Sequence, residues 1–126
     1  MDDRDLTVLV GAGLSGLGAG FVAAPALVGR VWLGEEVRHT GVQVALRGLG
    51  ARDLALGLGI LMAHRRGAPV RGWLEATALA AAADAATTLL AWHRLPWGGR
   101  LAGTLPSAAS AAVTASLAWR AGRRQV

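Results

Sequence analysis

The sequence predicts an all-α protein, a four-helix transmembrane bundle with up-down topology, and three observations lead to this prediction. Four apolar segments follow one another along the 126 residues, each near the roughly 20 residues that a helix needs to cross a bilayer. None of them alternates with the period of two that is typical of strands. Short charged stretches containing Gly or Pro separate them. We therefore expect one integral membrane domain over residues 1–126, surrounded by the lipid bilayer.

The predicted helices cover residues 6–28, 42–63, 72–92 and 101–119. No charge occurs between Asp5 and Arg30, and none occurs within residues 101–119. The chain opens with the acidic stretch MDDRD, whereas a signal peptide opens with basic residues, so we expect the first segment to remain as a helix. The second and third segments are interrupted by charged residues, which makes those residues candidates for a site.

The composition excludes several classes of protein. Only 17% of the residues are charged, below the roughly 25% typical of soluble domains. The absence of Cys excludes disulfides, iron–sulfur clusters and Cys nucleophiles. The net charge is +5, but the basic residues lie at the ends of apolar segments and the chain has one Phe and no Tyr for base stacking, so we expect no nucleic-acid partner. The His residues fall in predicted loops without an acidic cluster nearby, so we expect no metal and no cofactor.

Tryptophan and arginine mark the ends of the predicted helices. All five Trp residues lie near these ends, where indole rings favour the headgroup layer. Seven arginines belong to the N-terminus, the second connection and the C-terminus, namely Arg4, Arg65, Arg66, Arg71, Arg120, Arg123 and Arg124. Four belong to the opposite side, namely Arg30, Arg38, Arg94 and Arg100. Because arginine is enriched in cytoplasmic loops, we expect a multi-pass protein of the cell (inner) membrane with both termini in the cytoplasm.

A glycine motif near the N-terminus has two interpretations. Gly11-x-Gly13-x-x-Gly16 follows an apolar run, as in a dinucleotide-binding turn, and Glu35 lies about 20 residues further on. However, Pro25 interrupts the helix that should follow the turn, and no later strand-like run completes a doubly wound sheet. The membrane interpretation explains the same region as a stripe of small residues that lets another helix approach closely. This helix-packing stripe consists of Ala12, Gly16, Gly20 and Ala24.

Charged residues inside the second and third segments are the candidates for ligand binding, namely Arg47, Arg52, Asp53, Glu75 and Asp84. A charge near the bilayer centre costs at least about 2.5–3.5 kcal/mol, so such side chains usually face the bundle interior and have partners. Glu75 lies one helical turn after Arg71, and we expect an ion pair between them near the membrane surface. Arg47 is close enough to the end of its helix to reach the headgroups.

Arg52, Asp53 and Asp84 lie deeper in the predicted bundle. At 1.5 Å per residue, Arg52 and Asp53 are about 15–17 Å from the end of their helix, and Asp84 is about 20 Å from the same side. A short connection makes the two helices antiparallel neighbours, so we predict an ionic cluster of these three residues near the midplane. They are also the candidates for catalysis. Arg52 points about 100° away from Asp53, which leaves it open to a different neighbour.

Small and polar residues share the helix faces that the deep charges occupy. One side of the second predicted helix carries Gly50, Asp53 and Gly57, and one side of the third carries Thr77, Ala81, Asp84 and Thr88. The fourth places Ser and Thr among Ala on adjacent faces. We expect these faces to pack together or to line a cavity.

The stretch RHTGVQVALRGLGARDLALGLGILMAHRRG, residues 38–67, resembles small membrane proteins of actinobacteria that form the domain of unknown function 4267 family. The core RDLALG, residues 52–57, carries the likeness, and the four-helix layout extends it over most of the chain. The resemblance implies an architecture only, because no activity is established for the family. It supplies no catalytic residues.

Several functions remain open at the level of the sequence. The leading hypothesis is a small polytopic membrane protein whose Arg/Asp cluster organises the bundle and lines a site for a lipophilic ligand. The cluster can also serve as a purely structural salt bridge or as a proton or ion relay. A second hypothesis is a membrane-embedded isomerase or hydrolase, with Asp53 or Asp84 as acid/base and Arg52 stabilising an oxyanion. A third is an assembly or transporter subunit that forms a homo-oligomer or binds a membrane partner through the glycine stripe.

Overall fold

The computed structural model describes residues 1–123, and Arg124 of the predicted C-terminal arginine group lies outside them. The chain is all-α, as predicted, and the described residues form no strand. Five α-helices and two short 3-10 segments follow in the order α1 (Asp3–Ala23), α2 (Pro25–Leu33), η1 (Gly34–Arg38), α3 (Thr40–Arg65), α4 (Arg71–Leu90), η2 (Trp92–Arg94) and α5 (Trp97–Arg123).

The first predicted helix, residues 6–28, is in fact divided into α1 and α2. Ala24, at φ −137° and ψ 64°, separates them. Pro25 causes the break because it has no N–H to continue the helical ladder and its ring disfavours helical backbone in the residue before it. It then occupies the first position of α2, where proline is well accommodated. α2 is short, ends at Gly34 with φ 61°, and packs beside η1 and α5.

The N-terminus of α1 is closed by a capping box on Asp2. Its carboxylate accepts hydrogen bonds from the amides of Arg4 (2.8 Å) and Asp5 (2.9 Å), and the Asp5 side chain accepts one from the Asp2 amide (3.2 Å). The hydrogen bond from the Asp5 amide is the main reason that the pKa of Asp2 lies below its ordinary value of 3.8. This box explains why α1 begins earlier than the apolar pattern alone predicts.

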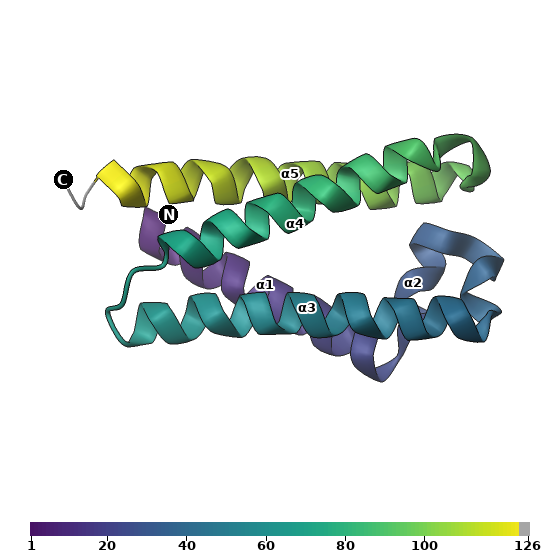
Figure 1. The fold of residues 1–126 in the computed structure, drawn as a ribbon, viewed down its shortest axis with the longest axis horizontal. Helices are drawn as coiled ribbons and strands as arrows, with labels where there is room; N and C mark the ends of the chain where they lie inside the picture. The colour runs from purple at the N-terminus through teal and green to yellow at the C-terminus, as the bar shows by residue number, and fades with distance from the viewer. Residues whose placement is uncertain (124–126) are drawn as a thin grey trace.

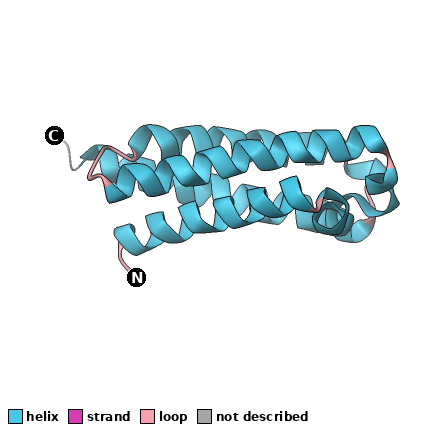
Figure 2. Cartoon of the chain, turned by 90° about the horizontal axis from the view of Figure 1, so that it is seen from below, coloured by secondary structure: helices cyan, strands magenta, loops and turns pink. Residues whose placement is uncertain are grey.

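The four long helices form two hairpins that lie side by side (Figure 1). α1 packs along α3 and α4 packs along α5, whereas few contacts join α3 to α4. The start of α1 and the end of α5 lie at the same end of the molecule (Figure 1), and Figure 2 shows the long helices running along one common axis. The helices therefore form a bundle in which the boundary between the hairpins is the least tightly packed region.

The interface between α1 and α3 depends on glycine, but not on the predicted stripe. A Cβ added to Gly18 would lie 2.5 Å from the Gly50 carbonyl oxygen, and one added to Gly57 would lie 2.6 Å from that of Gly11. The two backbones therefore touch where Gly11 and Gly18 face Gly50 and Gly57. Leu54 also takes part in this contact. A Cβ added to Gly18 would meet the backbone nitrogen of Leu54.

The stripe Ala12, Gly16, Gly20 and Ala24 does not make this contact. Ala12 and Gly16 are exposed, and a Cβ on Gly16 would meet nothing within 4 Å. Gly20 is approached only by the Val28 side chain of α2. The stripe is therefore not the face of α1 that crosses α3, which follows a spacing of seven and not four. Approach of a helix from another protein along the stripe stays a prediction.

The interior of the bundle contains several hydroxyl groups. Three of the five largest fully buried side chains are Thr77, Thr88 and Thr114. Each donates its hydroxyl hydrogen to a carbonyl four residues earlier, at 2.8, 2.8 and 2.6 Å, so no polar group is left unpaired among them. Asp53 is also inside, with 6% of its surface exposed. Of the four residues predicted to share one side of α4, Thr77, Ala81 and Thr88 are buried, and Asp84 is partly buried, with 24% of its side chain exposed.

The exterior of the bundle is correspondingly apolar along its length. Among residues 1–123, α1 and α5 are long and apolar enough to cross a membrane, and only 22% of the most apolar window of each is buried. Exposed large side chains include Leu9, Leu17, Leu27, Leu79 and Leu105. α3 and α4 are not among these candidate spans, and they are the helices that carry Arg47, Arg52, Asp53, Glu75 and Asp84.

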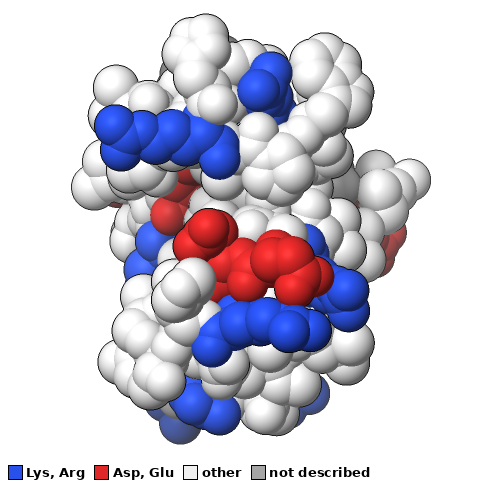
Figure 3. Space-filling model, turned by 90° about the vertical axis from the view of Figure 1, so that its right-hand side faces the viewer, with Lys and Arg blue, Asp and Glu red and all other residues white. Residues whose placement is uncertain are grey.

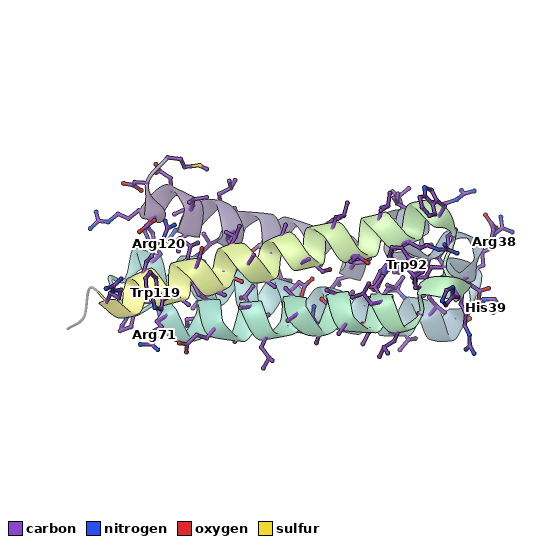
Figure 4. The ribbon with its side chains drawn as sticks, turned by 90° about the horizontal axis from the view of Figure 1, so that it is seen from above. Arg38, His39, Arg71, Trp92, Trp119 and Arg120 are labelled. Carbon is purple, nitrogen blue, oxygen red and sulfur yellow. The ribbon has the colours of Figure 1, made fainter. Side chains whose placement is uncertain are left out.

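Charged groups gather instead at the two ends of the bundle. The end formed by η1 and η2 displays acidic and basic side chains together (Figure 3), including the ion pairs Arg30–Glu35 (3.3 Å) and Arg38–Glu35 (2.9 Å). Figure 4 shows Arg71, Trp119 and Arg120 at one end and Arg38, His39 and Trp92 at the other. The Arg100 guanidinium lies 5.7 Å from both the Trp92 and Trp97 ring centres.

Candidate functional site

The predicted ionic cluster is present, and it joins the two hairpins. The Arg52 guanidinium of α3 donates two hydrogen bonds to Asp84 of α4, from Nη1 to Oδ1 at 3.0 Å and from Nη2 to Oδ2 at 2.6 Å. The same guanidinium donates to Oδ1 of Asp53 from Nε at 3.0 Å and from Nη2 at 2.8 Å. The pair with Asp84 is the two-pronged geometry that arginine makes with a carboxylate.

The residues of the cluster lie at the positions along their helices that the sequence predicts. Arg52 lies near the middle of α3, about 18 Å from Thr40 and about 20 Å from Arg65 at 1.5 Å per residue. Gly50 and Gly57 bring the Asp53 face of α3 against α1, which buries Asp53. The Arg52 Cβ leaves the helix in a different direction, but the long side chain returns to reach both carboxylates. Arg52 therefore serves its sequence neighbour as well as Asp84, which the helical angle alone does not indicate.

The charges in the cluster do not balance. Two carboxylates surround one guanidinium, which leaves one negative charge when both acids are ionised. Asp84 uses both of its oxygens to accept hydrogen bonds from Arg52, whereas both bonds to Asp53 end on Oδ1. Among the described residues, no hydrogen bond ends on Oδ2 of Asp53, so this oxygen is the acceptor that the cluster leaves available.

A cavity of about 290 Å³ opens next to the cluster, between the hairpins. Its walls are mainly apolar and come from all five helices, and its polar lining includes Arg52, Asp53, Asp84, Thr77, Ser107 and Ser110. The volume is close to the lower limit of roughly 300 Å³ for small-molecule pockets. The space beside the cluster is thus open to a small molecule and is not filled by side chains.

Trp32 forms part of the cavity wall, although its place near a helix end predicts a position in the headgroup layer. The break at Pro25 turns α2 back towards α5, and this brings the Trp32 ring against Gly103. Its Nε1 is buried without a hydrogen-bond partner among the described residues. Gly103 is required at this contact, because a Cβ there would overlap the indole ring.

Pro106 is a second feature of the site that the sequence analysis misses. It lies inside α5 and lines the cavity together with Ala102, four residues earlier. Because proline has no N–H, the Ala102 carbonyl lacks the donor that a helix normally supplies. The signal was present in the sequence as a single proline within residues 101–119.

Two of the five charged candidates lie outside this site. Arg47 is exposed and donates from Nε to the Val22 carbonyl oxygen at 3.1 Å, near the end of α1. Glu75 pairs with Arg71 at 2.7 Å, as expected, and both side chains are about half exposed. Neither residue lines the cavity, so Arg52, Asp53 and Asp84 are the candidates that the structure brings together.

No family model matches this chain, and neither does any curated protein or any solved structure. The resemblance to the actinobacterial family therefore remains an expectation. Within residues 1–123, no group of three His or acidic side chains is arranged to hold a metal ion. The cavity and the ionic cluster are therefore the features that indicate the chemistry of the site.

Proposed function

We propose that this chain is a small polytopic membrane protein that binds a lipophilic ligand between its two hairpins, beside the Arg52–Asp53–Asp84 cluster. In this proposal, α1, α3, α4 and α5 cross the membrane in up-down order with both termini in the cytoplasm. The observation that carries the proposal is the cavity, which has apolar walls, one ionic end and an apolar exterior around it.

The distribution of polarity supports the membrane part of the proposal. A core helix of a soluble protein can be as apolar as α1 or α5, but it is mostly buried, whereas these two helices are mostly exposed. Asp53 and the buried threonines lie inside instead, and the partly exposed side chains of Arg52 and Asp84 (35% and 24%) pair with one another. This arrangement suits hydrocarbon, because exposed leucines there cost nothing and inward charges satisfy one another.

The geometry of the cluster favours binding over the hydrolase or isomerase alternative. An oxyanion needs free donors, but Arg52 uses four hydrogen bonds on the carboxylates of Asp53 and Asp84. Asp84 likewise has both oxygens engaged. Asp53 alone retains an available oxygen, which can accept a hydrogen bond from a ligand.

Binding of a neutral amphiphile tests the proposal. We expect phenylbutanol to bind saturably to the purified protein in uncharged maltoside micelles, measured by calorimetry. Ala80→Phe places a large side chain in the cavity lining and should weaken binding by about tenfold or more, which corresponds to roughly 1.4 kcal/mol.

The matched control is Ala83→Phe, on the exposed side of the same helix, which should bind like the unmodified protein. Equal weakening by both variants, or no saturable binding at all, would contradict the proposed function.

A further inference from the structure

We propose that the ligand of this cavity is a lipophilic cation, whose ammonium group binds Oδ2 of Asp53. This inference rests on the proposed function and specifies the chemical class of its ligand. It follows from three properties of the site, namely its charge, its free hydrogen-bonding atoms and the composition of its walls.

The charge of the site favours a cation. Arg52 is the only basic residue among those that line the cavity, and it faces two carboxylates. The next basic residue along α3, Arg47, is bound to the Val22 carbonyl and does not reach the cavity. An uncompensated negative charge in low-dielectric surroundings is costly, so a bound cation stabilises the site and a bound anion destabilises it.

The hydrogen-bonding atoms also favour a donor. Asp53 as a residue is 6% exposed, and its Oδ2 has no partner among the described residues, so this acceptor is available. Arg52 has one N–H left after its four bonds to the carboxylates, and the buried Trp32 Nε1–H is also unpaired among the described residues. Of the unpaired atoms, the Asp53 oxygen is the charged one, and an ammonium group with several N–H donors matches it.

The residues that line the cavity indicate the chemistry of the body that carries the ammonium group. Phe21 and Trp32 line the cavity, and aromatic rings attract cations through their electron-rich faces. Leu14, Leu49 and Leu56 add aliphatic surface. A hydrated inorganic ion gains nothing from such walls, whereas an amine with an aryl or alkyl body buries its apolar part against them. The site therefore fits an organic ammonium compound of modest size.

Three probes with the same body and different head groups test this inference. Phenylbutylamine, phenylbutanol and phenylbutyrate carry a positive, a neutral and a negative head group at neutral pH. We expect the amine to bind the unmodified protein in maltoside micelles about tenfold more tightly than the alcohol, because it adds a charge-assisted hydrogen bond, and the carboxylate to bind most weakly. Ammonium chloride in hundredfold excess should not displace the amine.

Two carboxylate-to-amide variants assign the preference to one residue. Asp53→Asn should bring the affinity for the amine to within about twofold of that for the alcohol. Glu36→Gln removes the same charge from the exposed η1 segment and should leave the preference unchanged. If Asp53→Asn does not fold, the order of the three probes on the unmodified protein still decides the question.

The outcomes separate this inference from the proposed function. Equal affinity for the amine and the alcohol, or tighter binding of the carboxylate, overturns the cation inference while the binding function stands. Displacement by ammonium chloride overturns the requirement for an apolar body. Failure of all three probes to bind saturably overturns the proposed function itself.

Discussion

Arg52 is the residue on which the organisation of the site depends most. Its guanidinium contacts a carboxylate on its own helix and another on the opposite hairpin, so one side chain both neutralises buried charge and connects α3 to α4. Lysine would not replace it, because a single ammonium cannot make the two parallel bonds to Asp84. Removal of Arg52 leaves two neighbouring carboxylates without a counterion, which costs more than the pairs contribute.

A double-mutant cycle measures this connection at the scale of the residue. We expect Arg52→Gln and Asp84→Asn each to lower the free energy of unfolding, and their coupling energy to be about 1–3 kcal/mol. The same cycle on the surface pair, with Arg71→Gln and Glu75→Gln, should give about 0.3–0.5 kcal/mol, because both side chains are half exposed. Chemical unfolding in micelles provides both values, and coupling energies of equal size would contradict the structural role of Arg52.

At the scale of the element, the contact between α1 and α3 is the most constrained part of the fold. Gly11 and Gly18 meet Gly50 and Gly57 backbone to backbone, and this close approach is what buries Asp53 between them. The other long pair, α4 and α5, relies on alanine and threonine packing, which includes the contact between Gly103 of α5 and Thr88 of α4. The position of the carboxylate thus depends on glycines that have no chemical role themselves.

Two glycine-to-alanine variants of α1 test which of its faces packs against α3. Gly18→Ala should lower the free energy of unfolding by about 1–3 kcal/mol, because the added Cβ meets the backbone of α3. Gly16→Ala should be neutral or stabilising by up to about 1 kcal/mol, since its Cβ enters open space and alanine favours the helix. Thermal unfolding of both variants in the same detergent gives the comparison. A larger loss for Gly16→Ala would support assembly through the predicted stripe instead.

At the scale of the whole molecule, the two hairpins form a bundle with charged ends and largely apolar flanks. Its ends carry ion pairs and Trp–Arg contacts, and its interior combines an apolar core with buried threonines and Asp53. The loose boundary between the hairpins is where the cavity lies, so the same packing that leaves α3 and α4 with few contacts also leaves room for a ligand.

The absence of cysteine makes the proposed membrane topology directly testable. Ala68→Cys, in the connection between α3 and α4, should react with a membrane-impermeant maleimide only after the cells are permeabilised. His93→Cys, in η2 at the opposite end, should react in intact cells. Both positions are exposed, so accessibility within the protein does not limit the reaction. Equal labelling of the two variants in intact cells would contradict the up-down arrangement.

The sequence by itself determined the all-α class, the long helices and the depth of the charged cluster, because helical rise and hydropathy are local properties that survive in any packing. Only the tertiary structure decided which faces of α1 and α2 contact the other helices. Gly11 and Gly18, and not the predicted stripe, form the face of α1 that contacts α3. α2 turns back at Pro25, so Trp32 lines a cavity, and this cavity lies open between the hairpins. These outcomes depend on how helices cross one another, and a crossing angle is a relation between distant segments that no local pattern contains.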